Sequence, residues 1–125
     1  EVLLAVHRSY LRPVRALLGR VGVQAMAHIT GGGFPDNVRR VLPRGLSAVI
    51  DRAAWPVPAI FEFIQRVGGV DREEMYRVFN MGIGLVVIVR ERDTAAALAV
   101  LRRCRAAPRV IGRVEQGRVP VRLVH

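Results

Sequence analysis

Three consecutive glycines, Gly31 to Gly33, are the first feature of the sequence that could bind a ligand. They follow a short apolar run, Val23 to Ile29, and precede a segment from Pro35 that is expected to be helical. Glycines let backbone N–H groups approach a ligand closely, and a helix beginning beside them directs its positive end at the same point. The order of strand, glycine turn and helix therefore predicts a site for an anion such as a phosphate group.

Two polar residues stand next to these glycines. His28 lies three residues before them and Thr30 directly precedes them. A histidine at the end of a strand can act as an acid or base, and it can equally be a hydrogen-bonded structural residue. The spacing alone leaves both interpretations open.

A second glycine-rich stretch, Asn80-Met-Gly-Ile-Gly, comes directly before an apolar run. A dinucleotide fingerprint must follow a strand and open a helix, so this stretch is not one. Gly82 and Gly84 could simply permit a tight entry into the next strand. They could also lie beside the triple glycine and close one pocket, in which case Asn80 would offer its side-chain amide to a polar ligand.

The composition narrows the chemistry. The formal net charge is +10, and all 20 basic residues are arginine. Schiff-base chemistry and a Walker-type phosphate lysine are therefore excluded within these 125 residues. Arginine binds phosphate bidentately, although the complete exclusion of lysine also fits a compositional bias. Nucleic-acid binding ranks below ligand binding because the few aromatic residues fall on apolar faces of the expected helices.

Several other classes of site and location are disfavoured. The single cysteine, Cys104, excludes an internal disulfide, and no cluster with metal-ligand spacing can be assembled, so no metal site is expected in this chain. No apolar run approaches the roughly 18 residues of a membrane span, and the opening lacks a signal-peptide pattern. We expect no membrane association and a cytoplasmic location.

Periodicity and turn residues predict the secondary structure. Expected helices and strands alternate along most of the chain, and the closing stretch, in which Val and Arg alternate, is expected to form a hairpin around Glu115-Gln-Gly. The helices are expected from Ser9 to Gly19, over Pro35 to Leu42, from Pro58 to Gly68, from Asp71 to Phe79 and from Asp93 or Thr94 to a point before Pro108, and the strands over Val23 to Ile29, Leu46 to Ile50 and Leu85 to Val89. Val23 to Ile29 contains Ala and Met, which would equally suit a helix.

This order favours an α+β fold with helices packed on a mixed or antiparallel sheet, partly ferredoxin-like because strand, helix and hairpin follow one another at the end. The length suits a single domain spanning residues 1–125. The abrupt apolar opening suggests a piece of a longer chain.

Two tracts of the sequence carry a family resemblance: AHITGGGFPDNVRRVLP, and AVIDRAAWPVPAIFEFIQRVGGVDREEMYRVFNMGIGLVVIV. They resemble the C-terminal part of phosphoribosylformylglycinamidine cyclo-ligase, also called aminoimidazole ribonucleotide synthetase. The resemblance runs through most of Leu3 to Val89. In the tract HRSYLRPV, Arg8 and Tyr10 match the family, whereas His7 and Ser9 depart from it.

The resemblance implies an enzyme of purine biosynthesis that closes the imidazole ring of formylglycinamidine ribonucleotide, using ATP and Mg²⁺. It implies a dimer in which an N-terminal nucleotide-binding domain, absent from this sequence, faces the C-terminal domain across a substrate groove. It further implies that the groove wall contains the three glycines with the polar neighbours His28, Thr30 and Asn37, and a second turn formed by Asn80, Gly82 and Gly84.

The resemblance also implies a cyclo-ligase fold of the C-terminal-domain type, without its opening strand and helix. On this basis we expect the chain to be inactive alone and to act on a phosphorylated small molecule together with the missing domain or a partner chain. The alternative is a non-catalytic binding or assembly module, a split or truncated relative that pairs with a partner through an exposed sheet edge.

Overall fold

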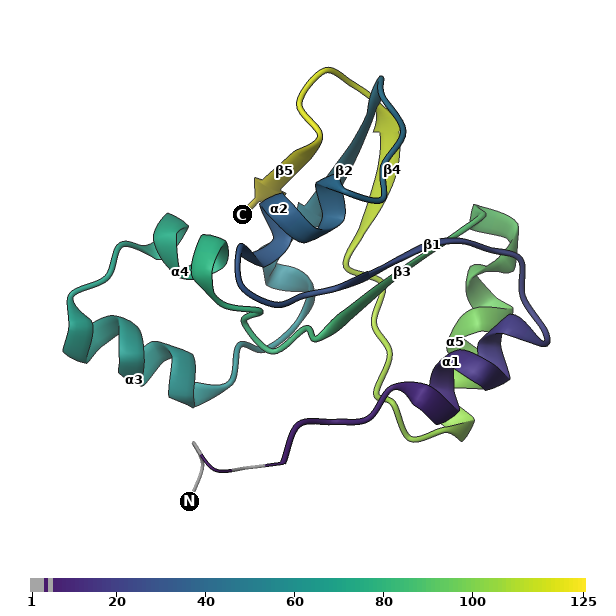
Figure 1. The fold of residues 1–125 in the computed structure, drawn as a ribbon, viewed down its shortest axis with the longest axis horizontal. Helices are drawn as coiled ribbons and strands as arrows, with labels where there is room; N and C mark the ends of the chain where they lie inside the picture. The colour runs from purple at the N-terminus through teal and green to yellow at the C-terminus, as the bar shows by residue number, and fades with distance from the viewer. Residues whose placement is uncertain (1–3, 5) are drawn as a thin grey trace. The chain divides into compact units, whose positions relative to one another are not determined.

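The computed structural model of the chain describes residue 4 and residues 6–125. Figure 1 shows an α+β arrangement in which helices alternate with short strands, as the sequence predicts. In order along the chain, the elements are α1 (Leu11–Leu18), β1 (Val23–His28), α2 (Gly33–Arg39), β2 (Leu46–Asp51), η2 (Arg52–Ala54), α3 (Ala59–Gly68), α4 (Arg72–Val78), β3 (Leu85–Val89), η3 (Glu91–Asp93), α5 (Thr94–Arg103), β4 (Gly112–Gln116) and β5 (Val121–Val124).

The chain packs as two compact units. One contains the described part of residues 1–24 together with residues 87–109, and the other contains residues 25–86 and 110–125. The division falls inside β1 and β3, which pair with each other in a two-stranded sheet. Both glycine-rich turns belong to the second unit.

The first unit is built on the contact between α1 and α5. Its core is apolar and consists of Leu17, Val21, Ala97 and Val100. In α1, Leu11 and Leu18 are more than half exposed while Pro13 and Leu17 are buried. The helix begins after Tyr10 rather than after Ser9, whose hydroxyl accepts a bond from the Leu11 N–H at 3.5 Å.

The second unit contains a three-stranded sheet with the order β4-β2-β5. β2 pairs antiparallel with β4 and parallel with β5, so the sheet is mixed. The predicted terminal hairpin is therefore wrong, because β2 lies between the two strands that were expected to pair. The physical reason is burial: Ser47 to Ile50 are all buried and take the central position, whereas β4 is largely exposed.

The two-stranded sheet connects the glycine-rich turns. Figure 1 shows β1 and β3 running in opposite directions. The Ile29 N–H, directly after β1, donates to the carbonyl oxygen of Gly84, directly before β3, at 2.8 Å. The prediction of a strand at Leu85–Val89 is confirmed, but its residues are only half-buried because a two-stranded sheet gives β3 a single neighbouring strand.

An aromatic cluster forms the centre of the second unit. Phe34, Trp55 and Tyr76 are almost fully buried, and their ring centroids lie 5.6 to 6.4 Å apart. Such aromatic pairs contribute roughly 0.5–1.5 kcal/mol each beyond their buried area. The three rings come from α2, from the residue directly after η2 and from α4, so they hold these segments together.

The remaining predicted helices form close to their expected positions. α3 ends at Gly69, which adopts a left-handed conformation, and α4 is capped by the Asp71 carboxylate, which accepts from the Glu73 N–H at 2.8 Å. Both features follow from the sequence. Val67, near the end of α3, is 69% exposed.

The central position of β2 can be tested by two matched substitutions. We expect Val49→Ala, in the buried strand, to lower the free energy of unfolding by about 2 kcal/mol through loss of two buried methyl groups. Val114→Ala removes the same atoms from β4, where the side chain is 37% exposed, and we expect a loss below about 1 kcal/mol. Urea titration of both variants measures the difference, and equal losses would contradict the sheet order.

Candidate functional site

The triple-glycine turn is held from inside by a buried side chain. Asn37 lies one turn into α2 and is 6% exposed. Its Nδ2 donates to the carbonyl oxygens of Thr30, Gly31 and Gly33 at 3.3, 3.2 and 2.8 Å. Three acceptors around one nitrogen fix the orientation of the amide. The turn therefore directs its carbonyl groups inward, onto its own helix.

The three glycines have different structural roles. Gly33 packs so closely on α4 that a Cβ atom there would overlap the backbone carbonyl of Tyr76. Gly32 has φ 92°, and a Cβ would lie 2.6 Å from Asp36 Oδ2. Gly31 has no neighbouring atom within 4 Å of its Cβ position and is exposed. A ligand can therefore approach the backbone at Gly31, while Gly32 and Gly33 determine the shape of the turn.

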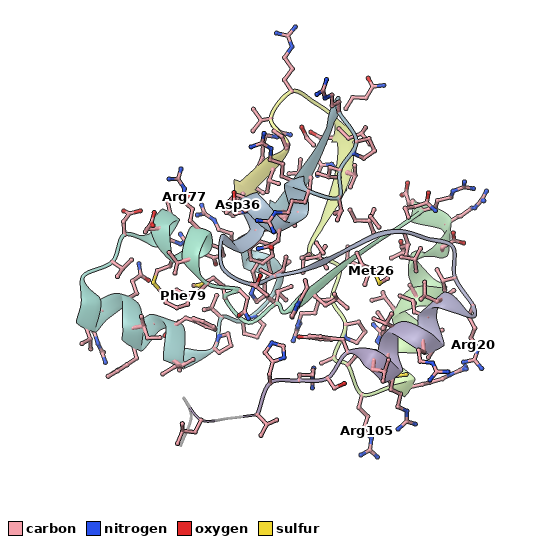
Figure 2. All side chains as sticks on the ribbon, in the orientation of Figure 1. Arg20, Met26, Asp36, Arg77, Phe79 and Arg105 are labelled. Atoms are coloured by element: carbon pink, nitrogen blue, oxygen red, sulfur yellow. The ribbon has the colours of Figure 1, made fainter. Side chains whose placement is uncertain are left out.

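The helix after the turn begins earlier than predicted. α2 starts at Gly33 with Gly32 as its N-cap, and no side chain caps it. Because α2 ends at Arg39, the predicted end at Leu42 is wrong by three residues. Figure 2 shows Asp36 on α2 and Arg77 on α4, the two helices that meet at Gly33.

The second turn is also fixed by hydrogen bonds. The Asn80 side-chain oxygen accepts from the Gly82 N–H at 2.9 Å, and the Met81 carbonyl accepts from the buried Trp55 Nε1 at the same distance. Gly82 has φ 97°, and a Cβ there would lie 2.5 Å from Pro58 Cδ. These contacts give Asn80 a positioning role within its own turn.

The structure places the predicted site residues on adjoining segments of the second unit. The bond from Ile29 to Gly84 joins the segment before the triple glycine to the end of the second turn. His28 is exposed at the end of β1, and the Thr30 hydroxyl lies 3.5 Å from Asn37 Oδ1. The sequence pattern gave no sign of the Trp55 bond to Met81, because the partner is a backbone atom 26 residues away.

Among the described residues, no group of three or more His, Cys, Asp or Glu side chains is placed to hold a metal ion. The Ala53 N–H bond, together with a weaker contribution from His125, holds the pKa of Asp51 below its usual value. His125 Nδ1 lies 3.3 Å from the Asp51 carboxylate. In the described part of the chain, no helix is long and apolar enough to cross a membrane.

Fold and turns together define the chain as an α+β domain that presents two glycine-rich turns at the ends of a paired β1 and β3. The chain belongs to the family of the AIR synthase related protein, C-terminal domain, which matches residues 1–124. The family resemblance seen in the sequence and the predicted α+β fold class are thereby confirmed.

Curated relatives and solved structures agree with this family. The chain is 51% identical over 117 residues to a phosphoribosylformylglycinamidine cyclo-ligase of Anaeromyxobacter sp. (strain Fw109-5), and 45% identical to one of Caldicellulosiruptor bescii. Each alignment covers 94% of this chain and 34% of the relative, so the chain spans about a third of the length of these relatives. E. coli HypE, a hydrogenase maturation protein, is similar in structure with a TM-score of 0.68 and 26% identity, over 91% of this chain and 35% of HypE.

Asn37 acts as a hydrogen-bond donor and Asn80 as an acceptor, so the same substitution at the two positions gives a matched test. Asn37→Asp replaces a donor by a buried carboxylate facing three carbonyl oxygens, and we expect it to cost about 3 kcal/mol of the free energy of unfolding. Asn80→Asp keeps the acceptor that Gly82 uses, so we expect a change within about 0.5 kcal/mol. Chemical denaturation of both variants at neutral pH measures this, and a tolerated Asn37→Asp would refute the inward clamp.

Proposed function

We propose that this chain is the substrate-groove part of an ATP-dependent ligase that cyclises formylglycinamidine ribonucleotide to aminoimidazole ribonucleotide in de novo purine biosynthesis. The observation that carries the proposal is the near 50% identity, over 94% of the chain, to relatives named for this cyclo-ligase activity. At this sequence identity, we expect the side chains of the two glycine turns to have the same roles in this chain as in those relatives. The two glycine turns and their connecting bond are the structural features that support it.

Within this proposal, the backbone of the triple-glycine turn contacts the phosphorylated substrate. Gly31 is the point of approach, because its surroundings are open. Gly32 and Gly33 shape the turn, and Asn37 keeps its carbonyl groups away from an incoming anion. His28 and Thr30 are exposed beside the turn and would contact polar groups of the substrate, with His28 the candidate acid or base. Asn80, Gly82 and Gly84 form the adjoining wall.

The remaining parts of the reaction are assigned outside this chain. The proposal assigns no Mg²⁺ ligand to the described residues, among which no group of three or more His, Cys, Asp or Glu side chains is gathered. The proposal places most contacts to ATP and Mg²⁺ in the part of the relatives that the chain does not span. The proposal also includes a separate N-terminal domain or partner chain, a homo-oligomeric assembly and a cytoplasmic location.

The proposed contact at Gly31 can be separated from the structural roles of its neighbours. In the full protein that contains this chain, we expect Gly31→Leu to change the free energy of unfolding by less than about 0.5 kcal/mol. We expect the same variant to raise the KM for formylglycinamidine ribonucleotide at least tenfold, equivalent to about 1.4 kcal/mol. Steady-state kinetics and thermal unfolding measure the two effects, and an unchanged KM would contradict the role of Gly31.

Gly33→Ala is the control for a purely structural effect. The new Cβ would overlap the Tyr76 carbonyl, so we expect a loss of at least ~3 kcal/mol of stability. Gly32 is a poorer probe than Gly31, since its positive φ and its contact with Asp36 make any side chain strained. Substitution at Gly32 would therefore mix stability with binding.

Because the proposal places most nucleotide contacts outside this chain, it leads to a further prediction. We expect the purified 125-residue chain to show no ring closure with ATP, Mg²⁺ and formylglycinamidine ribonucleotide, because the proposal places most nucleotide contacts elsewhere. Adding the complementary N-terminal domain of such a cyclo-ligase is expected to restore turnover. Product formation, followed by the absorbance of the diazotised aminoimidazole, measures both. Turnover by the chain alone would refute the assignment.

A further inference from the structure

Three arginines are among the residues that line a cleft, and this cleft shares no residue with the two glycine turns. Arg39 ends α2, Arg44 lies in the loop between α2 and β2, and Arg118 lies in the loop between β4 and β5. The cleft that they line together has a volume of about 370 Å³. This is within the range of roughly 300–1,000 Å³ found for small-molecule sites.

The backbone under the cleft is held by hydrogen bonds between the two loops. The Gly117 N–H donates to the Gly45 carbonyl at 2.9 Å, and the Ala48 N–H donates to the Pro120 carbonyl at 2.8 Å. The buried Ser47 hydroxyl donates to the Val119 carbonyl. Arg44 and Arg118 therefore extend from backbone segments whose relative position is fixed.

The positive charge of the cleft is uncompensated within the described part of the chain. Its lining contains no acidic side chain, and no ion pair found among the described residues includes Arg39, Arg44 or Arg118. Glu115, the acidic residue nearest to Arg118 in sequence, already pairs with Arg113 and Arg122. Like charges gathered in one cleft repel each other, and a bound anion relieves that repulsion.

We propose that this cleft binds the phosphate or diphosphate group of a small molecule. The guanidinium group presents a planar fork of donors that matches phosphate oxygens bidentately, and three forks from three segments can surround one such group. The rest of the lining is aliphatic, proline or glycine, with no aromatic side chain on which a nucleobase could stack. This argues for a compact anion and against a nucleic-acid strand.

The test measures binding of inorganic pyrophosphate to the purified protein by isothermal titration calorimetry at fixed ionic strength. We expect saturable binding, and we expect R39Q/R44Q/R118Q to weaken it at least tenfold. The matched control is R20Q/R66Q/R103Q, which removes the same charge from exposed arginines outside the cleft and is expected to change affinity less than twofold. Figure 2 shows the Arg20 side chain extending away from the ribbon.

Three outcomes would overturn the proposal. The first is the absence of saturable pyrophosphate binding. The second is an equal loss of affinity in both triple variants, which would indicate that the general electrostatic field of a chain of net charge +10 attracts the anion. The third is binding to phosphatidic-acid vesicles without binding to free pyrophosphate. If the glutamine variant fails to fold by circular dichroism, R39K/R44K/R118K keeps the charge and removes the fork. We then expect affinity to fall at least threefold, and unchanged affinity would refute the site.

Discussion

The buried amide of Asn37 is the constraint on which the glycine turn depends. A buried polar group must find partners, and Nδ2 finds them in three carbonyl groups of the preceding turn. α2 has no side-chain cap at its N-terminus, so these hydrogen bonds fix the path of the chain where it enters the helix. The turn takes its shape from the helix that follows it. The hydrogen bonds to Asn37 thus fix the backbone of the turn from within the chain.

The second turn is held in place through the aromatic cluster. Trp55 packs against Phe34 and Tyr76, and its indole N–H bonds to the Met81 carbonyl. The carbonyl of Tyr76 in turn lies where a side chain at position 33 would be. Each turn is therefore tied to the same rings, and the bond between Ile29 and Gly84 adds a direct connection. Displacing one turn would disturb the core that positions the other.

The sequence predicted the elements better than their partners. Strands form at Val23–His28, Leu46–Asp51 and Leu85–Val89, where apolar runs bounded by turn residues predicted strands, although the first run equally suited a helix. The hairpin failed because local alternation of Val and Arg identifies strands but not neighbours. β2 enters between β4 and β5 for reasons that no local pattern contains: its own burial, and the missing side chain of Gly112, which allows β4 to approach the Val49 carbonyl. Periodicity also does not say which apolar positions of a helix find a partner, and Leu18 and Val67 are both exposed.

The candidate site shows the same limit at the level of atoms. Residue types located both glycine turns, and the Ile29 bond places them side by side. The sequence could not show that the side chains of Asn37 and Asn80 form hydrogen bonds within their own turns, Asn37 as donor and Asn80 as acceptor. It also could not separate Gly31, which faces open space, from Gly33, which packs against backbone. An asparagine beside a glycine run is therefore ambiguous until its partners are known. Here both amides are bonded within their own turns, and Gly31 is the glycine of the first turn whose Cβ position has no neighbouring atom within 4 Å.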